Sequence, residues 1–321
     1  MTGKLPTDVA ASVKQRLLNI SRDRGEDFQL VLTRFVLERL LSRIGRSEFH
    51  DQFVLKGAML FSLWVDTPHR ATRDIDLLGF GESAVGRLIQ VFKNICLTQV
   101  EEDGVTFLPE SVQGIEIRED QEYNGIRITM EAGLGKARIP VQVDIGFGDA
   151  VTPVAAYAEY PATLNFPSPR IRIYPRETVV AEKLQSMVSL GMANSRMKDF
   201  FDLWIIGKTF SFEGEMLATA IEATFSRRKT ALPDALPSAL SAEFSEQAGK
   251  QTQWQTFIRR NQLTSNNLSL SAIIAEIRTF LLSPLNAAAR GEIFGFHWPP
   301  GGPWQRSSDE KQDHSSDRGG T

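Results

Sequence analysis

RATRDIDLL, residues 70–78, marks the point at which the chain changes from helix-forming to strand-forming sequence. From Asp74 onward charged and aliphatic residues alternate, and the run ends in a glycine-rich turn. This alternation is typical of a strand with one buried and one polar face. Because residues two apart on a strand point the same way, Asp74 and Asp76 project together while Ile75 enters the core.

The sequence on both sides of this strand divides into helical and alternating segments. Apolar residues at helical spacing predict two amphipathic helices between residues 7 and 48, with a break at Gly25. A third helix should follow Gly57 and end near Val65, and a fourth should cover 83–96. Short alternating runs between 105 and 147, separated by Gly and Asn-Gly turns, predict a small sheet.

The sequence of the C-terminal half predicts mostly helices rather than a mixture of helices and strands. Prolines between 153 and 169 indicate a linker before a short strand at 170–174. From Pro175 to about Leu282 the pattern is helical, with one break at Pro233 and Pro237. From Trp298 the sequence PPGGP and a polar tail predict disorder. We therefore expect an α+β fold with four regions: N-terminal helices over 1–50, a core with a small mixed sheet over 51–174, a helical domain over 175–295 and a disordered tail over 296–321.

Composition restricts the class of protein. The 321 residues are 42% hydrophobic with a net charge of -3, which is ordinary for a globular chain and gives no global signal for nucleic acid. One Cys and four scattered His exclude a disulfide framework and argue against a zinc site. No basic start leads into a long apolar run, so we expect a soluble cytoplasmic protein with no membrane partner. The acidic segment 99–131 should repel phosphates.

Three aspartates form a candidate metal site. Two carboxylates on one rigid strand, Asp74 and Asp76, suit hard cations such as Mg²⁺. A second apolar strand, 141–146, carries Asp144 on its polar face, whereas Asp149 reads as a turn residue. Three carboxylates from two strands of one sheet can hold two Mg²⁺ ions for an in-line phosphoryl displacement. A solvated acidic strand edge is the alternative interpretation.

The segment upstream of these aspartates offers further contacts for a phosphate. Lys56, Gly57 and Ala58 open the third helix, where small residues let backbone N–H groups approach phosphate oxygens. A purely structural glycine at a helix start would look the same. Arg70 and Arg73 flank the aspartates, and they could hold phosphates or neutralise the acidic cluster.

Lys183 falls within the apolar stripe of its predicted helix. An ammonium on that stripe needs an anionic partner, because burying an unpaired charge is unfavourable; a lysine that reaches the surface from the edge of the stripe is the alternative. Asp199 and Asp202 lie one helical turn apart and share a face, and Lys198 can pair with Asp202. As a surface feature this group would be unremarkable.

Five motifs in order give the chain a family resemblance. They are K-G-A-x-L at 56–60, R-x-T-x-D-I-D-L at 70–77, V-D-I-G-F-G-D at 143–149, Y-P-x-E-x-x-x-A-E-K-L at 174–184 and K-D-F-F-D-L-W at 198–204. The set resembles the AbiEii/AbiGii toxin family of nucleotidyltransferases, members of the polymerase-beta-like superfamily that act as toxins of type IV toxin–antitoxin systems. Many relatives carry Gly-Gly or Gly-Ser where this chain has Gly57-Ala58, so a phosphate contact there would use backbone N–H groups.

The resemblance implies an Mg²⁺-dependent enzyme that transfers a nucleoside monophosphate from an NTP to an acceptor and releases pyrophosphate. Asp74, Asp76 and Asp144 would ligate the metals, and Asp144 would help to deprotonate the acceptor hydroxyl. Lys183 would hold the triphosphate. The other nucleotide-binding residues would be Lys56, Gly57, Ala58, Arg73, Asp199 and Asp202.

The same resemblance implies an RNA acceptor, with a tRNA 3′ end as the expected target, and growth arrest countered by a separately encoded antitoxin, as in phage defence. The basic residues at 227–229 are a candidate contact for an RNA backbone, although a short basic run also fits a solvated surface. Arg170, Arg172 and Arg176 alternate along and beyond a predicted strand and form a basic patch beside Lys183. Three rivals stay open: a nucleotidyltransferase that modifies a protein side chain, a non-catalytic nucleotide-binding regulator and a structural partner protein.

Overall fold

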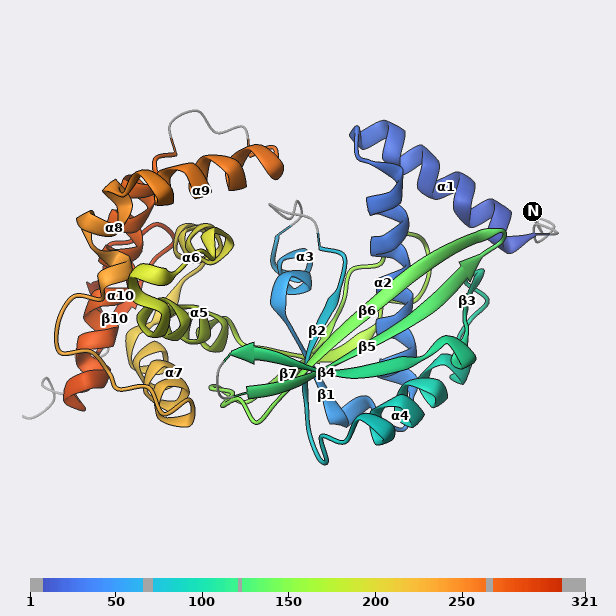
Figure 1. Cartoon of the computed structure of the whole chain (residues 1–321), viewed down its shortest axis with the longest axis horizontal. Helices are drawn as coiled ribbons and strands as arrows, with labels where there is room; N and C mark the ends of the chain where they lie inside the picture. Colours follow the sequence, from blue (N-terminus) through green and yellow to red (C-terminus); the bar gives the residue numbers. More distant parts are fainter. Residues whose placement is uncertain (1–7, 66–71, 121–122, 264–267, 308–321) are drawn as a thin grey trace, which may run out of the picture. The chain divides into compact units, whose positions relative to one another are not determined.

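The computed structural model describes residues 8–65, 72–120, 123–263 and 268–307. The chain divides into two compact units, one of residues 1–149 with 154–175 and one of residues 150–153 with 176–321 (Figure 1). The first unit combines helices with a large mixed sheet and the second is mainly helical, which confirms the expected α+β class. Residues 66–71, which include Arg70, lie outside the described residues.

The sheet of the first unit has its strands in the order β3-β5-β6-β2-β1-β8-β7, with β4 also paired to β5. The β2–β6 and β1–β8 pairs are parallel, and the other pairs are antiparallel. The prediction of a small sheet over 105–147 is confirmed but incomplete, since this sheet extends to strands on both sides of that segment. Its strands are β1 (Phe53–Lys56), β2 (Ile75–Gly79), β3 (Val105–Phe107), β4 (Gln113–Asp120), β5 (Tyr123–Leu134), β6 (Ala137–Phe147), β7 (Ala156–Glu159) and β8 (Arg170–Ile173).

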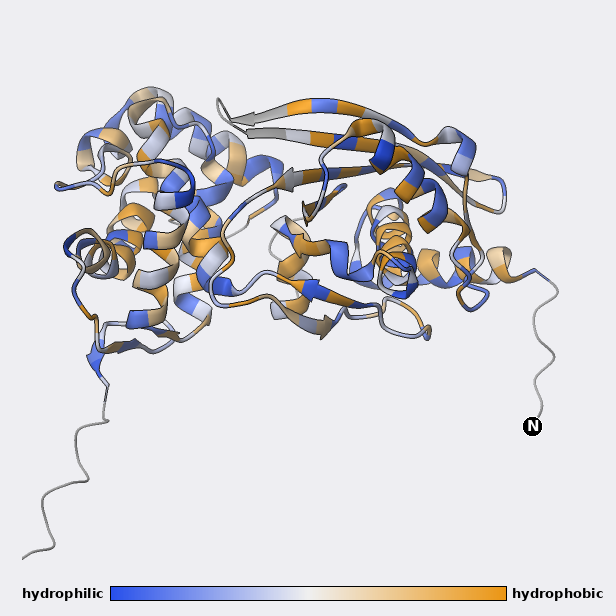
Figure 2. Cartoon of the chain, turned by 90° about the horizontal axis from the view of Figure 1, so that it is seen from below, coloured by the Kyte–Doolittle hydropathy of each residue, from blue (hydrophilic) through white to orange (hydrophobic). Residues whose placement is uncertain are grey.

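Helices cover the aliphatic face of this sheet. The Phe53 ring of β1 packs 5.6 Å from the Phe92 ring of α4, and Cys96 of α4 contacts Met130 of β5. Helix α2 packs on the same side, next to α4. The long strands carry hydrophobic and hydrophilic residues in turn, so their other face is polar (Figure 2). The helices of this unit are α1 (Val9–Arg24), α2 (Phe28–Arg46), α3 (Leu60–Trp64, after a 3-10 turn at Gly57–Met59) and α4 (Val85–Leu97), as the sequence predicted.

Two strands were missed in the first unit, β1 and β7. The segment between Pro153 and Pro169 was expected to be a linker, but it contains β7, which pairs antiparallel with β8. The Arg170 guanidinium lies 4.5 Å from the Tyr157 ring centre, and the Tyr157 hydroxyl donates a 2.6 Å hydrogen bond to Asp51. These contacts, rather than alternation of apolar residues, hold the strand in place.

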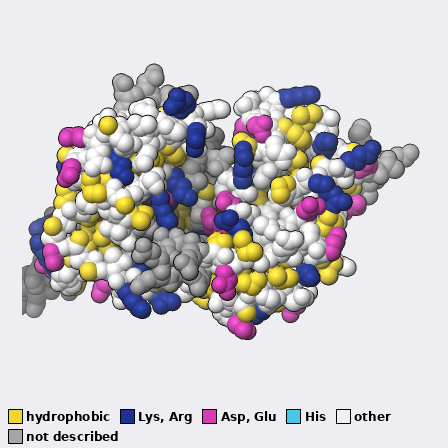
Figure 3. Space-filling model, in the orientation of Figure 1, with side chains coloured by type: hydrophobic (Ala, Val, Ile, Leu, Met, Phe, Trp, Pro, Cys, Tyr) yellow, Lys and Arg dark blue, Asp and Glu magenta, His cyan; other side chains and the backbone are white. Residues whose placement is uncertain are grey.

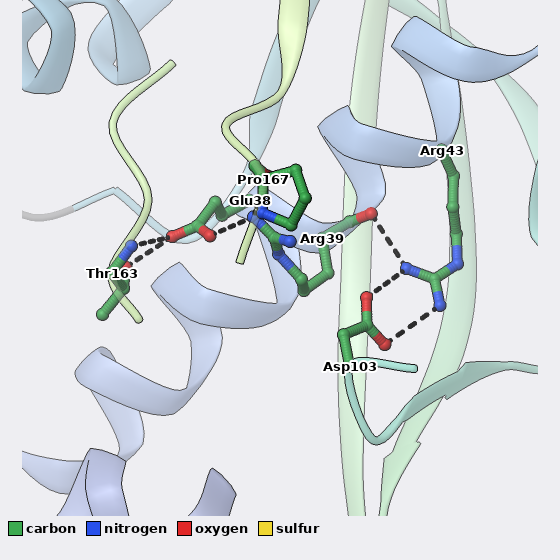
Figure 4. Close-up of polar contacts among 6 residues, drawn as sticks. All are labelled: Glu38, Arg39, Arg43, Asp103, Thr163 and Pro167. Atoms are coloured by element: carbon green, nitrogen blue, oxygen red, sulfur yellow. Dashed lines mark hydrogen bonds and ion pairs between the residues drawn. The ribbon is translucent and has the colours of Figure 1, made fainter. Parts of the chain in front are cut away.

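Buried charged side chains attach α2 to the loops around it through hydrogen bonds and an ion pair (Figure 4). Glu38, whose side chain is 0% exposed, pairs with Arg39 and accepts hydrogen bonds from the backbone N–H and the hydroxyl of Thr163. Arg43 forms a two-pronged contact with Asp103 at 2.9 and 3.2 Å. Burial raises the pKa of the Glu38 carboxyl above its ordinary value of 4.5, against the lowering effect of Arg39.

The second unit packs its helices around α10. Helix α7 contacts both α5 and α10, and α10 also packs on α6. The predicted break near Pro233 and Pro237 is confirmed, since it separates α7 from α8. Its helices are α5 (Arg176–Leu190), α6 (Met197–Thr209), α7 (Gly214–Arg227), α8 (Ala242–Glu246), α9 (Ala248–Arg260) and α10 (Leu270–Arg290), and its strands are β9 (Phe212–Glu213), β10 (Phe296–Trp298) and β11 (Gln305–Arg306).

The prediction for the C-terminal segment was wrong over its described part. Helix α10 continues beyond Leu282 through Pro284 to Arg290, and residues 296–307 include two strands rather than disordered chain. Proline at 284 removes the helical hydrogen bond to the carbonyl of Phe280, and the Trp304 indole N–H donates to that carbonyl at 2.8 Å. Trp298 similarly donates to the Gly207 carbonyl at the end of α6. Residues 296–307 are ordered because they satisfy backbone groups that the helices leave unpaired; residues 308–321 of the predicted tail lie outside the described residues.

Helix α10 is long and apolar enough to span a membrane by length and composition. It is also the central helix of its unit: Ile273, Phe280 and Leu281 are buried against neighbouring helices. A buried core helix passes the same test, and its packing favours that interpretation.

We predict that Arg39→Met lowers the free energy of unfolding by about 3–5 kcal/mol at pH 8, because it leaves a buried carboxylate without its partner. A raised carboxyl pKa means that its stabilising contribution is complete below pH 4.5 and is lost as the pH rises through the folded-state value. The loss should therefore be smaller at pH 5 than at pH 8 in urea unfolding followed by circular dichroism. Arg46→Met, which removes an exposed partner of Glu101, is the control and should cost under about 1 kcal/mol. An equal loss for Arg39→Met at both pH values would contradict this account.

We predict that Trp304→Phe lowers the free energy of unfolding by about 1–3 kcal/mol, because it leaves the buried Phe280 carbonyl without a donor while it keeps the aromatic packing. Trp204→Phe is the matched control, since its indole N–H donates to the solvent-exposed Glu276 carboxylate and should cost under about 1 kcal/mol. Thermal unfolding of both variants tests this, and equal losses would show that the backbone contact is unimportant.

Candidate active site

A row of four charged residues crosses the polar face of the first sheet. Lys56 of β1 is in register with Asp76 of β2, Asp76 with Asp144 of β6, and Asp144 with Arg127 of β5. Side chains in register on neighbouring strands project from the same face, here the face away from α2 and α4. We call these four residues the charged row. Asp74 precedes β2 by one residue and shares the parity of Asp76.

Arg127 holds the carboxylate at one side of this row. Its Nε and Nη2 donate to the two oxygens of Asp144, each at 2.8 Å, and the Gln142 amide contacts the same oxygens at 3.3 and 3.2 Å. The hydrogen bond to Asp144 raises the pKa of the Arg127 guanidinium, and the charges of Asp144, Asp74 and Asp76 raise it further. The carboxylates and the guanidinium thus form one electrostatic group.

Lys56 ends the row on the other side. Its ammonium lies 3.1 Å from Asp149, and the Tyr174 hydroxyl donates to the same carboxylate at 3.3 Å. Asp149 was predicted as a turn residue; it lies in the loop after β6 and in addition is the ion-pair partner of Lys56. The ammonium predicted to bind nucleotide is therefore largely buried beside a carboxylate of its own unit.

Gly57 gives Asp76 the space it occupies. A Cβ at Gly57 would lie 1.9 Å from the Asp76 Oδ2 atom, and the residue has a φ of +74°. No other amino acid fits both conditions. Ala58, the next residue, is buried, and the helix begins as a 3-10 turn. The prediction that a helical segment begins at Gly57 is confirmed, and the glycine also leaves space for the Asp76 carboxylate.

Asp74 and Arg73 complete the predicted first group. The Thr72 hydroxyl donates to Asp74 at 2.7 Å, and the Arg73 side chain is exposed. Among the described residues, no three or more Asp, Glu, His or Cys side chains converge closely enough to form a ready metal cage. The structure thus brings Asp76 and Asp144 into register, places Asp74 beside them and shows Asp144 engaged by Arg127.

The second unit contains its own buried charge cluster. The Lys183 ammonium of α5 lies 2.6 Å from Asp199 and 2.9 Å from Asp202, both of α6. The Lys183 side chain is 16% exposed and that of Asp202 is 0% exposed. The expectation that a lysine on the apolar stripe needs an anionic partner is confirmed. The partner found for Asp202 is Lys183, whereas Lys198 is exposed.

Basic residues near these clusters have partners within their own units. Arg228 of the 227–229 run contacts Glu182 at 3.4 Å and donates to Gln185, which attaches α7 to α5. Arg172 donates to the Asp51 carbonyl and lies over the Phe80 ring. Arg176 lies 3.9 Å from the centre of the Phe210 ring. These arginines help to fix the fold.

Arg127 is the site residue that sequence reasoning missed. The turn at Gly135-Lys136 joins β5 to β6 with Leu134 opposite Ala137. Counting back from that two-residue turn places Arg127 opposite Asp144. The signal was therefore present in the spacing of the hairpin.

Comparison with known proteins identifies the class of this chain. A sequence family described as the nucleotidyl transferase AbiEii toxin of a type IV toxin–antitoxin system matches residues 39–276. The match covers well over half of the chain, and the chain is accordingly a nucleotidyltransferase. It belongs to the AbiEii toxin family. No protein of curated function matches it.

Two solved structures from Helicobacter pylori resemble the chain weakly. One is described as a candidate nucleotidyltransferase and the other is JHP933. Both have 14% identity and a TM-score of 0.43, with 82% of this chain covered and 93% and 90% of the respective structures. At that level of similarity the two structures say nothing about the site of this protein.

We predict that Gly57→Ala destabilises the protein more than Gly25→Ala. Both glycines have positive φ angles, of +74° and +63°, but nothing lies within 4 Å of a Cβ at Gly25. The Gly25 variant thus reports backbone strain alone, of about 1–2 kcal/mol, whereas the Gly57 variant must also displace Asp76. Thermal unfolding compares the two, and equal losses would mean that Asp76 moves without penalty.

Proposed function

We propose that this toxin transfers a nucleoside monophosphate from an NTP to an RNA acceptor with the help of Mg²⁺. The observation that carries the proposal is the register of Asp76 and Asp144 on adjacent parallel strands, with Asp74 one residue before the strand. Their carboxylates lie on the polar face of the sheet. Two adjacent carboxylates would repel a triphosphate alone, but they can bind it together with a divalent cation.

The residues present fit Mg²⁺. This ion takes hard oxygen ligands, and it is usually bound by one or two carboxylates with waters and substrate phosphates in the other positions. A closed cage of protein ligands is therefore not required. Asp74, Asp76 and Asp144 would hold two such ions, which when bound would neutralise charge on the triphosphate and polarise the reacting phosphorus.

The chemistry assigned to the protein side chains is limited to protons and charge. An acceptor hydroxyl oxygen attacks the α-phosphorus, its bond to phosphorus forms, and the bond to the bridging oxygen of pyrophosphate breaks. Asp144 helps to remove the hydroxyl proton. Lys183 binds the triphosphate, with Asp199 and Asp202 orienting its ammonium. The other residues that we propose to bind the nucleotide are Lys56, Gly57, Ala58 and Arg73.

The acceptor and the biology rest on the family. A type IV system pairs the toxin with a separately encoded antitoxin, and we propose a tRNA 3′ end as the acceptor, growth arrest in the cytoplasm as the outcome and phage defence as its use. Lys and Arg are interspersed with Asp and Glu on the visible face of each unit (Figure 3). On this face, recognition of RNA would thus depend on local contacts rather than on one continuous basic surface.

Expression in a bacterial host tests the proposal. Wild type should arrest growth, and sequencing of small RNAs should reveal added nucleotides at 3′ ends. Asp76→Asn and Lys183→Ala should each lower transfer by at least about a hundredfold, because they remove charge stabilisation in the transfer step. Purified enzyme with radiolabelled NTP should require Mg²⁺ and label RNA.

Matched variants separate chemistry from folding. Glu131→Gln removes an exposed carboxylate of β5 in the same sheet, and Lys198→Ala removes an exposed lysine of α6; both should keep wild-type transfer and toxicity. Label in protein rather than in RNA would favour side-chain modification. Toxicity that survives Asp76→Asn would favour a non-catalytic regulator, and absence of Mg²⁺-dependent NTP binding would favour a structural partner.

A further inference from the structure

Lys250 of α9 is a buried lysine to which the proposed function assigns no role. It is 7% exposed, its ammonium donates a 2.7 Å hydrogen bond to the backbone carbonyl of Asn194, and it lies 4.8 Å from the centre of the Phe244 ring. Burial of an ammonium is unfavourable, and a hydrogen bond from a charged donor is among the strong interactions that offset it. The contact therefore holds the segment around Asn194 against α9.

Asn194 lies just before α6 and begins a series of hydrogen bonds that ends at the Lys183 ammonium. Its Oδ1 atom accepts from the backbone N–H of Arg196 at 2.8 Å, and the Arg196 carbonyl accepts from the backbone N–H of Asp199 at 2.9 Å. The Asp199 carboxylate accepts from the Lys183 ammonium at 2.6 Å. All of these residues belong to the second unit, so Lys250 and Lys183 are connected within one compact body.

The first turn of α6, which contains Asp199, has no side-chain cap. Its N-cap residue is Arg196, whose side chain makes no capping hydrogen bond, and a helix end without a cap frays more readily. We propose that Lys250 is a positioning residue: by holding the Asn194 carbonyl it fixes the first turn of α6, and through Asp199 it orients the Lys183 ammonium for the triphosphate. This inference rests on the proposed function.

Loss of the donor at position 250 should weaken nucleotide binding without removing any group that touches the nucleotide. Lys250→Met keeps most of the buried aliphatic stem but leaves the Asn194 carbonyl without its donor, so that Asp199 is less well fixed. We expect the dissociation constant for the NTP to rise about five- to tenfold, within the range found for members of one hydrogen-bond network. Lys250→Arg retains a charged donor and should stay within about threefold of wild type.

Isothermal titration calorimetry of the full chain in the presence of Mg²⁺ measures this effect. ATP, CTP, GTP and UTP are titrated separately into wild type, and the nucleotide that binds is the probe for every variant. Thermal unfolding identifies a temperature at which each variant is folded. If Lys250→Met is unfolded at every temperature, Asn194→Ala replaces it, because it removes the next hydrogen bond of the series, from Arg196, and should have the same effect.

Trp254→Phe is the matched control for a purely structural contribution. Trp254 lies on the same helix, is 1% exposed, and its indole N–H donates at 2.8 Å to the backbone carbonyl of Leu268, which precedes α10 rather than α6. Both variants remove a buried donor to a backbone carbonyl, so both should lower the midpoint of thermal unfolding. Only Lys250→Met should raise the dissociation constant for the NTP.

A double-mutant cycle tests whether Lys250 acts through Asp199. In the Asp199→Asn background the last hydrogen bond of the series is already altered, so Lys250→Met should change the dissociation constant by less than about twofold. Equal fold-changes in the wild-type and Asp199→Asn backgrounds would show that Lys250 affects binding by another route, and they would overturn the inference.

The inference and the proposed function fail in different ways. Weaker NTP binding by Lys250→Met, with rescue by Lys250→Arg and no effect of Trp254→Phe, supports the positioning role. Wild-type binding by Lys250→Met, or an equal loss in Trp254→Phe, in a protein whose Lys183→Ala variant binds NTP weakly, overturns the inference and leaves the proposed function intact. A wild type that binds none of the four nucleotides, or a Lys183→Ala variant that binds as wild type does, overturns both.

Discussion

The first unit is organised around the repulsion between two carboxylates. Asp76 and Asp144 are in register on adjacent parallel strands, about 4.8 Å apart in the sheet, where like charges oppose each other. Arg127 lies on one side of the pair and Lys56 on the other, and Gly57 leaves room for the Asp76 carboxylate. The sheet can keep these charges together because its opposite face is packed against α2 and α4, so the polar face does not have to supply the core.

The second unit solves a related problem with the signs reversed. Lys183 is an ammonium on a mostly buried helix face, and the two carboxylates of α6 balance it. The two carboxylates compensate the ammonium, which therefore stays charged in a mostly buried environment without substrate. In both units a buried charged group is held by oppositely charged neighbours, which keeps the folded protein stable before any ligand binds.

The sequence predicted those features of the structure that depend on a local residue pattern, and it failed where contacts between distant segments decide the conformation. The alternation in DIDLL and the apolar face of 141–146 were sufficient to place Asp74, Asp76 and Asp144, because a strand has only two faces. The helical stripe around Lys183 correctly predicted an anionic partner. The prediction of disorder over 296–307 failed for the opposite reason. PPGGP predicts disorder by its composition, but the indoles of Trp298 and Trp304 donate hydrogen bonds to backbone carbonyls that lie far away in sequence.

The sequence alone determined most of the helices, the strands that carry the aspartates, the face on which each aspartate projects and the family to which the motifs point, because each depends on spacing along the chain. Tertiary structure decided which charges meet between separate elements: Lys56 with Asp149, and Lys183 with Asp199 and Asp202. Those pairings depend on strand register and helix packing between distant segments. A charge has no preferred partner in sequence, and only the folded backbone selects the one within hydrogen-bonding distance.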